Sequence, residues 1–151
     1  MIRFLLTSGL CLVLSGFASA EQAGDIAAWF NDGMRYYEAR DYQAASHAFK
    51  AATAAAPDND EYVHWLGKTY GRQAEQAGGF NAIKLAKLTR SALERAVALN
   101  PENRDAVRDL ARYYADAPGF LGGDKGKAAA LRARLKAAPG AVPNPASASQ
   151  S

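Results

Sequence analysis

Two stretches of this sequence carry one pattern: residues 29–37 read WFNDGMRYY, and residues 63–71 read VHWLGKTYG. A glycine and a tyrosine of the first stretch return 34 residues later, Gly33 as Gly67 and Tyr36 as Tyr70. A second set of small, aromatic and proline positions returns 44 residues later, with Ala45, Phe49, Ala52 and Pro57 matched by Thr89, Leu93, Ala96 and Pro101. Ten residues have therefore been inserted inside the second unit.

The first unit has the chemistry of a helical hairpin. Its apolar and aromatic positions recur three and four residues apart, which places them on one side of a helix. Gly33 lacks a side chain, so a second helix can cross close to it, with Ala45 and Ala52 as small residues and Phe49 filling the gap. Pro57 stands where that second helix must end. One apolar face stays uncovered, and units of this kind stack on one another.

The order Trp, Gly, Tyr, small, aromatic, Ala, Pro in a 34-residue period resembles the tetratricopeptide (TPR) repeat. A third unit matches the second after 44 residues, through Val107, Leu110, Ala111 and Tyr114. The chain also resembles bacterial exported TPR proteins in which a lengthened middle repeat precedes a turn like residues 118–123, PGFLGG. The resemblance implies an all-α fold: a three-hairpin TPR-like α-solenoid over residues 21–139, with an extended second hairpin.

Caps and breaks along the chain predict six helices. They cover residues 26–39, 42–56, about 60–77, 81–99, one that ends at residues 117–118, and one that reaches about residue 138. Four polar residues are the expected N-caps: Asp25, Asp41, Asn81 and Asp124. The ten inserted residues are shared between two antiparallel helices, so the tip of the second hairpin should overhang its neighbours by about one to two turns.

Both ends of the chain are expected to lie outside this fold. Residues 1–20 have a positive start, an apolar run over residues 4–17 and the small residues Ala18, Ser19 and Ala20, which is the pattern of a secretory signal peptide. We therefore predict export across the inner membrane, to the periplasm in a Gram-negative bacterium, with no membrane span in the mature chain. Residues 140–151 are polar and small, and are predicted to form a disordered tail.

The cysteine and the charges narrow the functional classes. Cys11 is the only cysteine and lies in the predicted signal peptide, so the mature chain has no disulfide or thiolate metal site. Residues 21–61 hold 8 acidic and 3 basic residues, whereas residues 62–151 hold 7 acidic and 14 basic residues. This asymmetry affects which partners approach and from which side. Export and a net charge of only +3 argue against nucleic acid as the partner.

No motif in the sequence indicates catalysis. Glu61 and His64 have the Glu-x-x-His spacing of carboxylate-bridged metal sites, but the second copy and the further glutamates are missing. The glycine-rich stretch at residues 122–127 lacks the first glycine and the final hydroxyl of a phosphate-binding loop. We expect no enzyme, no metal and no cofactor, although catalytic residues need not be adjacent in sequence and a site in the concave surface stays open.

In TPR proteins the first helix of each hairpin lines the concave face. The matching positions define a predicted partner-binding groove: Phe30, Met34, Tyr37, Glu38, His64, Lys68, Arg72, Arg108 and Arg112. Arg108 and Arg112 are four residues apart and could hold one carboxylate, which resembles half of the carboxylate clamp of chaperone-binding TPR domains. Phe30 and Met34 stand where that clamp has polar residues. An acidic or C-terminal peptide with a hydrophobic anchor is the expected ligand.

Two alternatives to this site remain. The arginines could instead pair with Asp105, Asp109 and Asp116 on a solvated face. The second concerns the extended tip, where Phe80, Ile83, Phe120 and Leu121 either pack on one another or form an exposed docking patch. The first hypothesis for function is thus an exported adaptor that binds a peptide or helix of a partner protein. The second is a structural subunit of an envelope assembly, or a homodimer, that docks through the tip; the sequence leaves the oligomeric state open.

Overall fold

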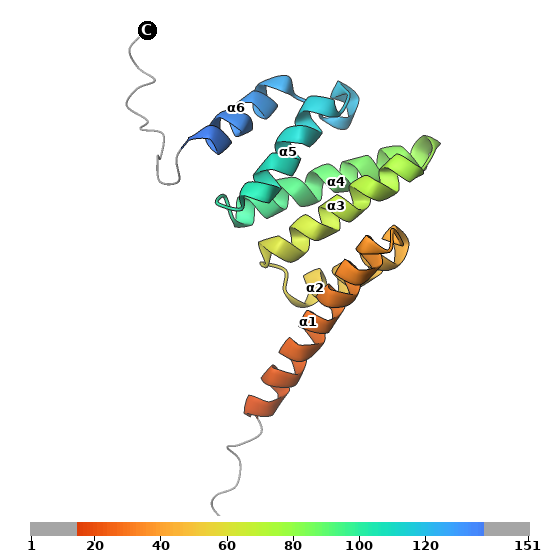
Figure 1. The fold of residues 1–151 in the computed structure, drawn as a ribbon, viewed down its shortest axis with the longest axis vertical. Helices are drawn as coiled ribbons and strands as arrows, with labels where there is room; N and C mark the ends of the chain where they lie inside the picture. Colours follow the sequence, from red (N-terminus) through yellow and green to blue (C-terminus); the bar gives the residue numbers. More distant parts are fainter. Residues whose placement is uncertain (1–14, 138–151) are drawn as a thin grey trace, which may run out of the picture.

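A computed structural model describes residues 15–137, with side chains from residue 24 onward, and this part of the chain is all-α (Figure 1). The helices are α1 (Ser15–Glu38), α2 (Tyr42–Ala55), α3 (Asp60–Gln76), α4 (Gly79–Leu99), α5 (Arg104–Asp116) and α6 (Lys125–Lys136), with a short 3-10 helix, η1 (Gly119–Leu121). Residues 15–137 contain no strand, as the sequence predicts. Among the described helices, none combines the length and the apolar character needed to cross a membrane.

Helices that are neighbours in sequence are also neighbours in space. The chain forms three hairpins, α1 with α2, α3 with α4 and α5 with α6, and the contacts of α2 with α3 and of α4 with α5 join them in order. Figure 1 shows the three hairpins following one another from the red and orange end of the molecule to the blue end. The two helices of the second hairpin have 17 and 21 residues, and each is longer than α2, α5 and α6, which have 14, 13 and 12 residues; this agrees with the predicted extension of the second hairpin.

Side-chain caps begin four of the helices. The side-chain oxygens of Asp41 and Asp124 accept hydrogen bonds from the backbone N–H of Ala44 and Lys127, at 3.0 and 2.9 Å. Two further caps lie 44 residues apart, at Asn59 and Asn103, and they accept from the N–H groups three residues on. Each cap satisfies a donor that the first helical turn leaves unpaired. The predicted caps Asp41 and Asp124 are confirmed.

Two other predicted caps are wrong. α1 begins at Ser15, so Asp25 lies inside the helix. Residues 15–25 contain no proline and include several good helix formers, so the helix can continue through them and need not start at Asp25. α4 begins at Gly79 after Gly78, without a side-chain cap, and Asn81 is already helical. Most of the predicted signal peptide (residues 1–14) and the whole predicted tail (residues 140–151) lie outside the described residues.

Arg40, two residues after the end of α1, has an unusual backbone conformation. Its φ of 61° is the only positive φ of a non-glycine residue in the described range. The N–H of Arg40 donates to the carbonyl of Tyr37, and the N–H of Asp41 donates to that of Tyr36. This pair of bonds is the Schellman motif, whose left-handed position is usually a glycine. An arginine there carries backbone strain that a glycine would not.

The glycines shared by the first two repeats are points of close helix contact. A Cβ atom built on Gly33 would lie 2.5 Å from the ring of Phe49, which is itself 0% exposed. A Cβ atom on Gly67 would lie 3.1 Å from the Cβ of Ala92, so α4 crosses α3 there with slightly more room. Around Phe49 pack Ala45, Leu66 and Tyr70, so the first core joins α1 and α2 to α3.

The turns between hairpins are held by one contact made twice. The guanidinium of Arg95 in α4 donates to the carbonyl oxygen of Pro57, and that of Arg134 in α6 donates to the carbonyl oxygen of Pro101. The two prolines are equivalent positions 44 residues apart. In both cases the second helix of one hairpin fastens the turn that ends the previous hairpin. The repeat in the sequence is therefore also a repeat of contacts.

The residues at the tip of the second hairpin and in η1 do not bury one another. Phe80 is 92% exposed and Phe120 is 72% exposed, whereas Ile83 and Leu121 are half-buried. The contact between α4 and the turn around η1 is made further along α4, where the guanidinium of Arg90 lies against Gly122. Arg90 is ten residues, about 15 Å, beyond Phe80 along the helix. Mutual packing of the two phenylalanines, one of the two interpretations of the tip, is therefore wrong.

Candidate functional site

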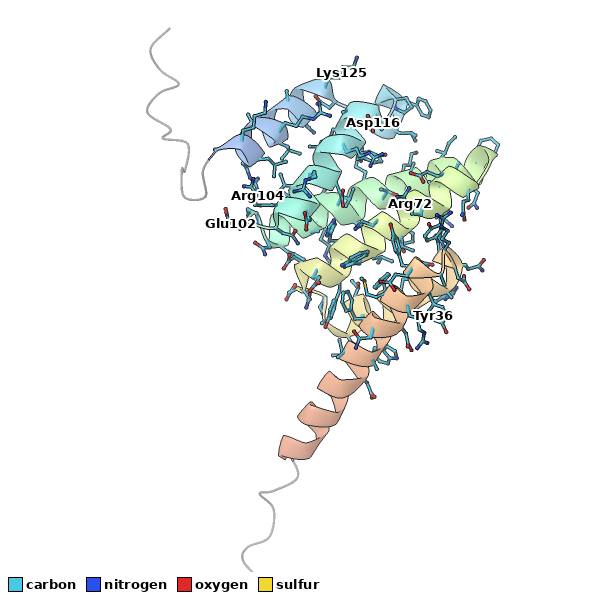
Figure 2. The ribbon with its side chains drawn as sticks, in the orientation of Figure 1. Tyr36, Arg72, Glu102, Arg104, Asp116 and Lys125 are labelled. Carbon is cyan, nitrogen blue, oxygen red and sulfur yellow. The ribbon has the colours of Figure 1, made fainter. Side chains whose placement is uncertain are left out.

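A hollow of about 340 Å³ opens between α3 and α5, with α4 as its floor and the end of α1 at one side. We call it the α3–α5 groove. Its walls carry charged side chains, while Thr89 and Leu93 of α4 lie beneath them. Figure 2 labels Arg72 on α3 and Asp116 on α5, which both contribute to the walls. The overhanging part of the second hairpin supplies Glu75 at the far end.

The predicted groove residues divide into two sets. Four of them line the α3–α5 groove: Tyr37, Lys68, Arg72 and Arg112. The other five lie elsewhere. Phe30 and Met34 pack partly buried against the first core, His64 is only 4% exposed, and Glu38 and Arg108 lie on the surface outside the lining. Burial of Phe30 follows from its contact with the ring of Tyr62, whose centroid is 4.7 Å away.

Lys68 is held in place by aromatic rings. Its ammonium nitrogen lies 3.8 Å from the centroid of Trp65 and 5.9 Å from that of Tyr37. The negative faces of such rings attract a cation, and partial desolvation strengthens the attraction. The Tyr37 and Trp65 rings also meet edge to face at 5.3 Å. Lys68 therefore presents a fixed positive charge on the α3 wall, with no need of an acidic partner on its own helix.

His64, which is buried, and Asp109, which is half-buried, form a link between α3 and α5. His64 Nε2 and Asp109 Oδ2 lie 2.7 Å apart, and the imidazole N–H donates because an ionised carboxylate can only accept. Burial raises the pKa of the Asp109 carboxyl, but the hydrogen bond from His64 and the charges of His64, Lys68 and Arg108 outweigh it, so the pKa lies below its usual value. The link fixes the position of a carboxylate that lines the groove.

The remaining charges of the groove are paired along their own helices. Arg72 donates to the hydroxyl of Tyr37 and to Glu75, at 3.4 and 2.9 Å, and these two bonds raise the pKa of its guanidinium. Arg112 lies 3.6 Å from Asp116, which is a looser contact. Three cationic and three anionic side chains line the groove: Lys68, Arg72 and Arg112 face Glu75, Asp109 and Asp116. The basic side chains predicted for the groove are therefore balanced by acids.

The arginines of α5 pair with acids of their own helix, as the alternative interpretation of this surface predicts. Arg108 pairs with Asp105 at 2.5 Å and Arg112 with Asp116, each within the helix. Asp109, the third acid of that interpretation, bonds to His64 instead. The two arginines are consequently not joined on a common site. Only Arg112, on the groove side, is positioned to exchange its partner for a ligand.

The floor of the groove is the part that sequence reasoning missed. Thr89, Leu93 and Ala86 belong to the second helix of a hairpin, whereas only first helices were expected to contribute. Tyr113 and Leu121 close one end, and the Tyr113 hydroxyl donates to the carbonyl of Leu121 at 3.0 Å. Gly71 has no side chain and Thr89 has a small one, where α3 and α4 cross. These two residues are the signal that could have indicated that α4 is accessible between α3 and α5.

Within residues 24–137, no three His, Cys, Asp or Glu side chains gather closely enough to hold a metal ion. His64 is engaged with Asp109, and His47 is exposed on α2. The groove thus offers hydrogen-bonding and charged groups over the side chains of α4. Comparison of the sequence with protein-family models and with curated proteins finds no match.

Proposed function

We propose that the chain is a TPR-like α-solenoid with an extended second hairpin. Three observations support this interpretation: the paired glycines Gly33 and Gly67 at helix crossings, the equivalent caps Asn59 and Asn103, and the repeated arginine contact with a proline carbonyl. Each ties a repeat in sequence to a repeat in geometry. A stack of hairpins leaves a continuous surface along its first helices, and proteins of this architecture use that surface to bind other chains.

We infer that the protein is an exported adaptor that binds a segment of another protein in the α3–α5 groove. The observation that carries this proposal is the groove itself, in which Tyr37, Lys68, Arg72 and Arg112 converge from three first helices over an apolar floor. Ligand sites are typically hollows of this kind, with a few placed polar groups over apolar surface. A volume of about 340 Å³ suits a few side chains of an extended segment.

The charges suggest the chemistry of that segment. Arg112 and Asp116 make a loose ion pair, with both side chains largely exposed, and such a pair contributes little to stability. A carboxylate of the partner can replace Asp116 at a small cost and gain a charge-assisted hydrogen bond. Tyr113 and Leu121, which are half-buried, offer apolar surface in the same groove. We therefore expect an acidic side chain or a C-terminal carboxylate next to an apolar anchor residue.

Site-specific photocrosslinking in cells tests the groove. A photoreactive residue at Arg112 should capture the partner, and the same residue at Arg132, exposed on α6, should not. Mass spectrometry then identifies the captured protein. Capture at both positions, or only at Arg132, would contradict binding in the groove.

A second candidate function is docking of the extended tip into an assembly or a homodimer. The 92% exposure of Phe80 favours it, because burial of this aromatic side chain against another protein surface would lower the free energy. Size measured against protein concentration separates the two functions. An adaptor keeps one size, whereas a homodimer that forms through the tip separates on dilution.

A further inference from the structure

The end of the molecule formed by the second hairpin tip and η1 exposes two phenylalanines. Phe80 is 92% exposed at the start of α4, and Phe120 is 72% exposed in η1. Figure 1 shows the α3–α4 turn and η1 at the same end of the molecule. This end lies away from the Pro57 and Pro101 turns, where the arginine contacts hold successive hairpins together. Neither phenylalanine contributes to the described core clusters.

One face of α4 connects the two aromatic positions. Phe80, Ile83, Lys84 and Lys87 are spaced three and four residues apart, so they lie on one side of the helix. One turn further on, Arg90 reaches Gly122, two residues after Phe120. We call the set Phe80, Ile83, Lys84, Lys87 and Phe120 the tip surface. It extends about 15 Å along α4 before it meets the turn that carries η1.

The tip surface, as defined, contains two cationic side chains and no acidic one. Lys84 and Lys87 are exposed, and neither takes part in an ion pair found among residues 24–137. Glu75, near the end of α3, is paired with Arg72. Cationic side chains between exposed aromatic ones are the pattern of surfaces that lie on anionic membranes.

We propose that the tip surface docks the protein onto a bilayer that carries anionic phospholipids. Phe80 and Phe120 enter the boundary between headgroups and acyl chains, and Lys84 and Lys87 face the phosphate groups between them. A bilayer accommodates two separate aromatic anchors without a pocket for either, whereas a protein partner would need two matching pockets at their spacing. None of the tip-surface residues lines the α3–α5 groove, so this inference does not depend on the proposed binding in the groove.

Vesicle cosedimentation tests this docking with the chain that starts at Glu21. Residues 1–20 are omitted because their apolar run would itself bind lipid, and circular dichroism checks that the shortened chain folds. The chain should bind vesicles of mixed phosphatidylglycerol and phosphatidylcholine at low salt, and not vesicles of phosphatidylcholine alone. Added salt should weaken binding, because the headgroup attraction is screened.

Variants locate the contact. Phe80→Ser combined with Phe120→Ser should weaken binding by about tenfold or more, since two aromatic side chains no longer enter the bilayer. Lys84→Gln and Lys87→Gln should each weaken it by about fivefold and reduce its salt dependence. The matched control is Leu99→Ser, which removes a 36% exposed apolar side chain at the opposite end of the same helix and should leave binding unchanged.

Three results would overturn the proposal. The first is no binding to the anionic vesicles at low salt while circular dichroism shows the chain folded. The second is equal binding of the double phenylalanine variant and the unaltered chain. The third is a self-association that the double variant abolishes, which would make the tip surface an interface between protein chains.

Discussion

The contact of Gly33 with Phe49 allows a quantitative test of the first hairpin. In the variant Gly33→Ala, the new Cβ atom would lie 2.5, 2.6 and 2.9 Å from three ring atoms of Phe49. The ring cannot move away freely, because Phe49 is 0% exposed and packs between Phe30 and Trp65, at centroid distances of 5.6 and 6.2 Å. Overpacking of this kind typically costs about 1–3 kcal/mol.

A second glycine supplies the control for helix propensity. Replacement of glycine by alanine within a helix stabilises by about 1 kcal/mol when there is room for the methyl group. Gly71→Ala has that room, since its Cβ atom would lie 3.5 Å from Thr89, an ordinary contact. Gly67→Ala, at 3.1 Å from Ala92, should fall between the other two variants.

Urea unfolding followed by far-ultraviolet circular dichroism measures all three variants. The free energy of unfolding should fall for Gly33→Ala, change little for Gly67→Ala and rise for Gly71→Ala. Equal stability of Gly33→Ala and Gly71→Ala would show that α1 does not pack on Phe49 as described.

Three further predictions concern the turn after α1, the carboxyl of Asp109 and the extension of the second hairpin. Arg40→Gly should raise the free energy of unfolding by about 0.5–1 kcal/mol, because the left-handed φ of 61° costs glycine no strain; an unchanged urea midpoint would contradict the strain. The pKa of Asp109 is lower in the folded chain than in the unfolded one, so its contribution to stability is present above the unfolded pKa of about 3.9 and is lost as the pH falls through the folded pKa. Thermal unfolding should therefore show a deficit of Asp109→Asn at neutral pH that shrinks in acid, and a deficit independent of pH would refute the assignment. Deletion of residues 75–84 should leave amide exchange in residues 117–123 unchanged, whereas Arg90→Ala should accelerate it, since Arg90 makes the contact with that turn; faster exchange after the deletion would mean that the tip itself protects the turn.

Local features of the fold could be predicted from the sequence because local chemistry determines them. The Asp41 and Asp124 caps, the end of α5 before Pro118 and the break at Gly78 each depend on a few adjacent residues. The close approach at Gly33 also followed from the sequence, since the absence of a side chain matters only where another helix crosses. The start of α1 was not predictable in this way, because Asp25 is a good cap residue in a stretch that can also continue as helix.

The candidate site could be predicted only in part, because it depends on how helices turn relative to one another. Spacing placed Lys68 and Arg72 on the correct wall, but it could not show that His64, one turn earlier, is rotated into the core and bonds to Asp109. Nor could spacing show that Arg108 pairs with Asp105, whereas Arg112 pairs with Asp116. The exposure of Phe80 likewise depends on where η1 contacts α4, a tertiary fact without a local signal.

Binding in the α3–α5 groove is tested most directly by two substitutions one turn apart on α5. Arg112 lines the groove and Arg108 does not, although both are exposed arginines in an ion pair within the helix. Affinity for the partner captured by crosslinking is measured over a range of salt concentrations for Arg112→Ala and Arg108→Ala. The proposal predicts weaker binding and a flatter salt dependence for Arg112→Ala alone. Equal affinities of the two variants at low salt would place the binding surface outside the groove.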